Sequence, residues 1–201
     1  MNAMTHLPAL LLSFVLTASQ ALISAGEAAD TSTPVAQAQR SANATPTRTR
    51  GMIIVSTVGQ PISLHLENGA LIFCDERGAR KLDLATTRES SQDRACPAQE
   101  EPNAACSGLG LDISVRSPLS EPNDIIDFDG WSKPLKGRVH DCAADGGTLA
   151  VVTASRVVLV DIEKRSAKDI SQKGGDRIAI SSRWVAWSIG NELRLVLRPA
   201  L

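Results

Sequence analysis

The sequence of 201 residues predicts an all-β domain built from repeated antiparallel hairpins. The first observation is an internal repeat, because residues 67–84 and 145–162 superimpose without a gap at an offset of 78 positions. The second is the C-terminal third, where runs of β-branched residues alternate with short turn sequences. A unit this short cannot bury an apolar face alone, so neighbouring copies must stack.

The two clear copies share a turn glycine, an apolar strand residue and an aspartate: Gly69, Leu71 and Asp83 in the first copy, and Gly147, Leu149 and Asp161 in the second. In the second copy the pattern predicts antiparallel strands at 148–152 and 156–162, preceded by a turn at 145–147. A third copy follows at an offset of 36. Its expected elements are strands at 177–180, 185–187 and 193–196 and a turn at 189–191.

The repeated residues resemble the blades of β-propellers. Two stretches are similar to blade sequences, DGGTLAVVTASRVVLVDIEKRSAKDI (145–170) and LENGALIFCDERGARKLDLATTRE (66–89). The offset of 78 also equals two repeats of the length near 40 that is typical of propeller blades. The WD-repeat dipeptides Gly-His and Trp-Asp are absent from the sequence. The resemblance implies a compact or partial propeller-like array of blades. A β-sandwich is the alternative, since regularly spaced strands are typical of both folds.

The stretch between the clear copies, 103–138, is irregular. Strands are expected at 108–115 and 124–128, whereas Pro118, Pro122 and Pro134 are confined to edges or loops because proline cannot donate to a strand ladder. Three arrangements remain open: a four-bladed ring, a partial propeller completed by another subunit, and the sandwich.

The N-terminus indicates export. Residues 7–25 are apolar or small and uncharged, so 1–25 is interpreted as a signal peptide, with a retained membrane anchor as the alternative. Residues 26–50 are rich in Ala, Thr, Ser and Pro and are expected to form a flexible leader. The β-repeat domain is then 51–201, and its expected location is periplasmic or secreted. Membrane attachment is expected only if the N-terminal segment is not cleaved.

Four cysteines lie in the expected domain, and an even number in an exported chain predicts two disulfides. Three pairings are open. The favoured pairing joins Cys96 to Cys106 around a short loop, and Cys74 to Cys142 across the chain.

Two places in the sequence suggest chemistry. His140 and Cys142 would share one face of a strand as a dyad, but only if Cys142 were reduced, and the disulfide interpretation is preferred. Asp127 and Asp129 precede Gly130 in the manner of a calcium loop, so they are the candidate ligand or metal residues. No resident cofactor is expected apart from this calcium hypothesis.

The function class follows from what the composition lacks. A net charge of −1 and few aromatic residues argue against nucleic-acid binding. Nucleophile elbows and phosphate-binding glycine loops are absent from the sequence, which favours a non-enzymatic protein. We expect an exported binding protein that presents loops of a disulfide-linked β scaffold to a protein or small ligand. The alternative is a hydrolase, or an accessory or inhibitor subunit of a periplasmic enzyme complex.

Overall fold

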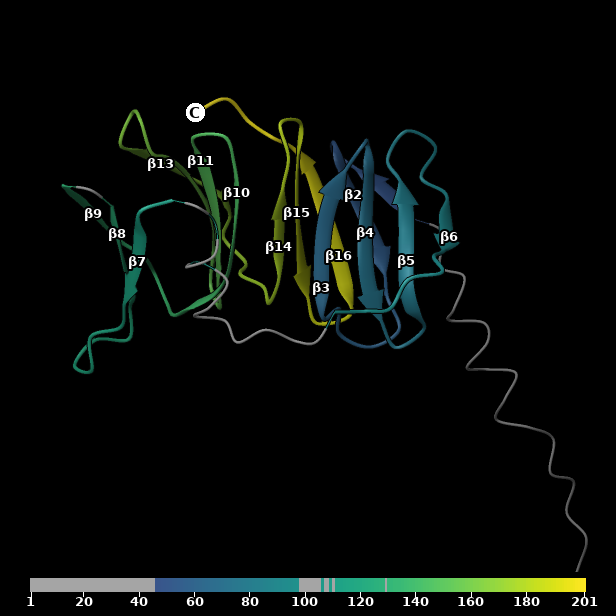
Figure 1. The fold of residues 1–201 in the computed structure, drawn as a ribbon, viewed down its shortest axis with the longest axis horizontal. Helices are drawn as coiled ribbons and strands as arrows, with labels where there is room; N and C mark the ends of the chain where they lie inside the picture. The colour runs from purple at the N-terminus through teal and green to yellow at the C-terminus, as the bar shows by residue number, and fades with distance from the viewer. Residues whose placement is uncertain (1–45, 98–105, 107–108, 110, 129) are drawn as a thin grey trace, which may run out of the picture. The chain divides into compact units, whose positions relative to one another are not determined.

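The computed structural model describes residues 46–97, 106, 109, 111–128 and 130–201, which all belong to one compact unit spanning 34–201. Within these residues the strands form four antiparallel sheets (Figure 1), which confirms the predicted all-β class. The expected signal peptide and most of the expected leader lie outside the described residues. No helix in the described part of the chain is long and apolar enough to cross a membrane.

We number the sheets 1 to 4 by the position of their central hairpins along the chain and list their strands in the order of pairing. Sheet 1 consists of β3 (Ser63–Glu67), β4 (Ala70–Asp75), β5 (Gly78–Asp83) and β6 (Glu89–Ser91). Sheet 2 consists of β7 (Ile113–Arg116), β8 (Ile125–Phe128) and β9 (Trp131–Pro134). Sheet 3 consists of β10 (Val139–Asp145), β11 (Thr148–Thr153), β12 (Val157–Asp161) and β13 (Ser166–Ser171). Sheet 4 consists of β14 (Ile178–Ile180), β15 (Trp184–Ile189), β16 (Glu192–Leu197), β2 (Met52–Ser56) and β1 (Thr47–Thr49).

The sequence repeat corresponds to equivalent hairpins in different sheets. The pair β4–β5 and the pair β11–β12 have the same register, since Ala70 lies opposite Asp83 and Thr148 lies opposite Asp161. The third copy is the hairpin β15–β16, at the predicted offset of 36 from β11–β12. Each hairpin also pairs with the strand that precedes it in the chain, which is β3, β10 or β14. The repeat unit is therefore a sheet rather than a single hairpin.

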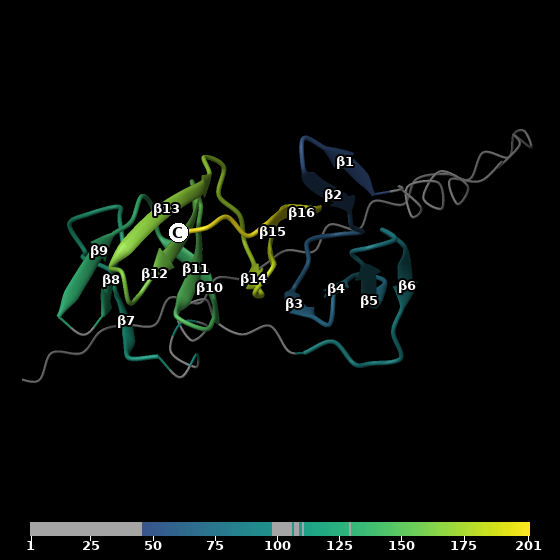
Figure 2. The ribbon, with the colours of Figure 1, turned by 90° about the horizontal axis from the view of Figure 1, so that it is seen from above.

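Sheet 4 is assembled from both ends of the described chain. Strand β2 pairs with β16, with Met52 opposite Val196 and Ser56 opposite Glu192, and Figure 2 shows β1 and β2 beside β16. Strand β1 pairs with β2 and begins at Thr47, within the stretch that the sequence predicted as leader. The ordered β structure therefore begins before the predicted boundary at Gly51.

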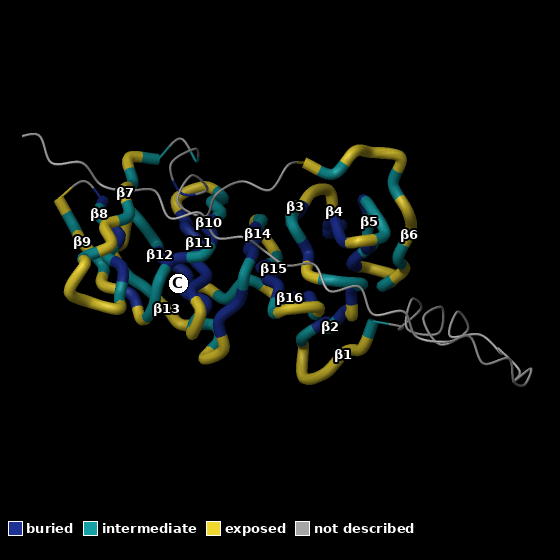
Figure 3. Tube along the Cα trace, turned by 90° about the horizontal axis from the view of Figure 1, so that it is seen from below, coloured by how far each residue is buried: buried dark blue, intermediate teal, exposed yellow. Residues whose placement is uncertain are grey.

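Three buried apolar clusters join the sheets in the order 2–3–4–1. Strands β8 and β11 share one cluster, β11 and β15 share the second, and β15 and β4 share the third. The central strands β11, β12 and β15 are buried on both faces, and every residue of β11 is buried (Figure 3). On β15, Trp187 faces the cluster shared with sheet 3 and Trp184 packs against the cluster shared with sheet 1. The two indoles therefore lie on opposite faces of β15.

Sheets 1 and 2 are the two ends of this order. In sheet 2 one face carries Phe128 and Trp131, whose stacked rings lie 4.9 Å apart between centroids, and the other carries the polar row Ser114, Asp127 and Ser132. Among the described residues no buried cluster joins sheet 2 to sheet 1. A ring closed through sheet 2 would bury this polar row, so the sheets form a series with two ends.

The irregular stretch was predicted in part. Strand β8 matches the expected strand at 124–128, and β7 overlaps the C-terminal end of the strand expected at 108–115. Strand β9 was not predicted because it contains Pro134, which lies on an edge strand of sheet 2 where no ladder donor is needed.

Candidate functional site

A groove lies where the edge strands of three sheets meet. Strand β14 contacts both β10 and β3, and the groove between them has a volume of about 390 Å³. Its lining is mainly apolar, and the apolar residues that the strands contribute are Leu64, Leu66, Ala143, Ala144, Ile178, Ala179 and Ile180. We call this the axial groove, because it lies along the first strand of each of the three sheets.

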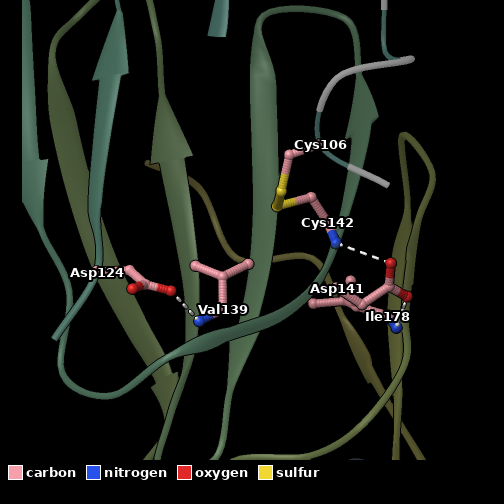
Figure 4. The surroundings of a disulfide bond; sticks show 6 residues. All are labelled: Cys106, Asp124, Val139, Asp141, Cys142 and Ile178. Carbon is pink, nitrogen blue, oxygen red and sulfur yellow. Dashed lines mark hydrogen bonds between the residues drawn. A yellow bond between two sulfur atoms is a disulfide. The ribbon is translucent and has the colours of Figure 1, made fainter. Parts of the chain in front are cut away.

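Asp141 fixes two of these strands to each other. Its Oδ1 accepts a hydrogen bond from the Cys142 N–H at 2.9 Å, and its Oδ2 accepts one from the Ile178 N–H at 2.9 Å (Figure 4). The second bond joins β10 to β14 across two sheets. Asp141 is only 9% exposed, so its carboxylate is a structural acceptor at the wall of the groove.

The structure pairs the cysteines differently from the favoured prediction. The disulfides are Cys74–Cys96 and Cys106–Cys142, with Cα atoms 5.7 Å and 5.1 Å apart (Figure 4 shows the second). Cys74 and Cys142 belong to sheets 1 and 3, which are separated by sheet 4 in the packing order, so they do not meet. Each instead binds a cysteine of the intervening connection.

Two disulfides in one domain are typical of proteins that fold in an oxidising compartment outside the cytosol. The disulfides therefore support a secreted or extracellular location, which agrees with the sequence prediction of an exported protein.

Arg177 is the functional candidate that the sequence analysis missed. It lies directly before β14, lines the axial groove and is 8% exposed. Its backbone is fixed by two hydrogen bonds, since its N–H donates to Ser188 Oγ and its carbonyl accepts from the Ser188 N–H, both at 3.0 Å. The sequence analysis used Arg177 only as the first residue of the strand expected at 177–180. The available signal was a charged residue directly before a run of apolar strand residues.

His65 is a second ionisable side chain on the groove. Its side chain is 63% exposed, and its Nε2 lies 3.3 Å from Oε2 of Glu67. The imidazole therefore lies at the solvent side of the groove, in contrast to Arg177.

His140 and Cys142 do not form a dyad. Cys142 is bonded to Cys106, and the Nδ1 atom of His140 lies 2.8 Å from the Gly175 carbonyl oxygen. The pairing of β10 with β11 shifts register between Val139 and Asp141, which places His140 at a bulge. The alternation that would have put both side chains on one face is broken there.

Asp127 lies on the polar face of sheet 2, which contributes no strand to the groove. Its carboxylate accepts hydrogen bonds from Arg116, including one at 3.0 Å from Nη2, and from the Ser132 hydroxyl. These bonds lower the pKa of Asp127 to about 2. Asp129 lies outside the described residues. The described residues contain no cluster of three or more His, Cys, Asp or Glu side chains arranged to hold a metal ion.

Asp124 stabilises the connection between sheets 2 and 3. Its Oδ2 accepts from the buried Val139 N–H at 2.7 Å (Figure 4), and its Oδ1 accepts from Arg138 Nη1 at 2.6 Å. Burial raises the pKa of Asp124, but the hydrogen bonds from Val139 and Arg138 outweigh this effect, so the net pKa is lowered. The sequence analysis had placed this residue only in a strand.

Comparison with known proteins identifies no family. No protein-family model matches the sequence, and no curated protein matches it. Among solved structures, the extracellular domain of the one component system BT4673 from B. thetaiotaomicron is similar at 8% identity and a TM-score of 0.30, over 67% of this chain and 19% of that one. The computationally designed Ika4 protein is similar at 10% identity and a TM-score of 0.30, over 69% and 91%. The N-terminal domain of Nup159 is similar at 9% identity and a TM-score of 0.29, over 78% and 50%.

Proposed function

We propose that the protein is a non-enzymatic binding protein of the periplasm or the extracellular space, and that its axial groove holds a small ligand. One observation carries the proposal: edge strands of three sheets converge on a mainly apolar groove that contains a buried cation. Small-molecule sites combine an apolar lining with a few fixed polar groups, and a volume of about 390 Å³ lies within their usual range.

The groups that suggested chemistry in the sequence have other partners. Asp127 is bound to Arg116 and Ser132, Cys142 is disulfide-bonded, and His140 contacts a backbone carbonyl. A binding role needs none of them. It needs rigid walls, which the disulfides and the Asp141 bridge between β10 and β14 supply.

The experiment is a thermal-shift screen of small molecules against the oxidised protein and two variants. Ser63→Phe places a ring on the groove wall of β3, and Ser90→Phe makes the same change on the exposed strand β6, outside the groove. We expect ligands that raise the Tm of the wild type and of Ser90→Phe but not of Ser63→Phe. Ligands that stabilise all three proteins equally would contradict the groove as the binding site.

A further inference from the structure

We propose that the axial groove selects a small organic carboxylate with an apolar body, and that Arg177 is the residue that binds the carboxylate. The inference rests on the proposed function, because it names the ligand class of the same groove. It starts from a buried arginine at the groove wall whose guanidinium has no partner among the described residues.

Arg177 has no hydrogen-bond or ion-pair partner for its guanidinium among the described residues. Other partly covered arginines are paired: Arg80 Nε with Glu89 Oε1 at 2.7 Å, and Arg198 Nη1 with Asp145 Oδ2 at 2.7 Å. Asp141 is the acidic residue of the groove lining, and both of its oxygens accept backbone N–H groups. Arg177 is thus a permanent cation, 8% exposed, whose guanidinium has no ion pair or hydrogen bond among the described residues.

In the proposed site the guanidinium nitrogens of Arg177 face the groove, whose lining includes this residue. The only described side-chain atom that is both fully covered and unpaired is Nε1 of Trp187. Since the guanidinium nitrogens are unpaired, they must keep some accessible surface. Arg177 lines the groove and is only 8% exposed, so we assign this small accessible surface to the groove. A guanidinium presents a planar fork of donors that fits a carboxylate with two parallel hydrogen bonds.

The rest of the lining specifies the remainder of the ligand. Leu64, Ile178 and Ile180 bring apolar side chains to the same space, and the groove volume of about 390 Å³ is small for a binding site. An inorganic anion would leave these apolar walls in contact with water, and a neutral apolar molecule would leave Arg177 unpaired. A compact carboxylate with an aliphatic body satisfies both groups.

The test uses hexanoate as the probe and calorimetric titration of the full oxidised chain, with 1-hexanol and inorganic phosphate as comparison ligands. Arg177→Met removes the charge and keeps most of the side-chain volume. Arg183→Met makes the same change at an exposed arginine that lines a different pocket. We expect hexanoate to bind wild type and Arg183→Met with equal affinity and Arg177→Met at least tenfold more weakly. We expect both comparison ligands to bind the wild type at least tenfold more weakly than hexanoate.

A second readout concerns stability and does not depend on the probe. Without ligand, Arg177→Met should unfold at a higher temperature than the wild type, because it removes a buried charge that has no ion pair among the described residues. A lower Tm for Arg177→Met without ligand would show a structural role and overturn the inference. Equal hexanoate affinity of wild type and Arg177→Met would also overturn it. Wild-type binding of 1-hexanol but not hexanoate would overturn the carboxylate class while leaving the proposed groove-binding function intact.

Discussion

Gly174 allows the chain between sheets 3 and 4 to pass very close to the turn between β11 and β12. A Cβ atom at Gly174 would lie 1.9 Å from the Thr153 carbonyl oxygen and 2.2 Å from the carbonyl carbon of Ala154. The next residue, Gly175, donates its N–H to the same Thr153 oxygen at 2.9 Å. All the obstructing atoms are backbone, so no side-chain rotation can relieve the contact in Gly174→Ala.

We expect Gly174→Ala to destabilise the protein by about 3 kcal/mol, the upper end of the range for overpacking, because the turn itself must move. For a domain of this size that corresponds to a Tm lower by roughly 6–12 °C. The measurement is urea unfolding followed by tryptophan fluorescence, for which the buried Trp187 is a suitable reporter.

Gly147→Ala is the matched control. The nearest atoms to a Cβ at Gly147 are 3.6 Å away in the flexible side chain of Glu163. This change should be neutral or stabilise the protein by about 0.4–1 kcal/mol through the unfolded state. If Gly174→Ala unfolded within about 0.5 kcal/mol of the wild type, the close approach at Thr153 would be refuted.

Three further predictions concern ionisable and bonded side chains. Arg116→Ala should raise the pKa of Asp127 from about 2 towards its ordinary value in an NMR titration. Because the folded pKa is depressed, the wild-type contribution of this carboxylate is present above about pH 4 and is lost as pH falls through 2; an unchanged pKa in the variant would contradict the assignment. Replacing Cys106 and Cys142 together by serine should cost about 3–4 kcal/mol in urea unfolding, from the closed loop alone, and non-reducing peptide mapping that paired Cys142 with another cysteine would overturn this pairing. Asp124→Ala should cost about 1–3 kcal/mol, because it leaves a buried backbone N–H without an acceptor, and an unchanged urea midpoint would show that water replaces the carboxylate.

The hairpins of the fold were predictable because their signals are local. The β-branched run from Thr148 to Val152 and the turn at 190–191 encode strands and a turn within a few residues of sequence. The repeat between Gly69 and Gly147 then indicated that the same hairpin is used in more than one sheet.

The pairing of β2 with β16 could not be predicted in this way. Met52 and Val196 are adjacent across a ladder but carry no local mark of their partnership. The prediction of the disulfide pairing was wrong for the same reason. Short sequence separation favoured Cys96 with Cys106, whereas pairing depends on which sheets enclose the connection between them.

The candidate site was the least predictable part. Arg177 is distinguished by a guanidinium that has no partner among the described residues, and that property depends on the groups that surround it in space. Asp127 illustrates the converse, because its acidic sequence context suggested a ligand residue while Arg116 and Ser132 on neighbouring strands occupy its oxygens.

The composition of sheet 4 constrains the order of folding. The strand from Met52 to Ser56 leaves the ribosome before almost all of the domain, yet its partner, β16, is among the last segments to be made. Closing so long a loop is entropically slow, and until it closes the apolar side chains of Ile53 and Val55 have no sheet to join. A chain that is exported before it folds avoids this delay during synthesis, since both ends are then available at once. Slow refolding with one dominant late step, and sensitivity to deletion of residues 192–197, are the kinetic signs of this arrangement.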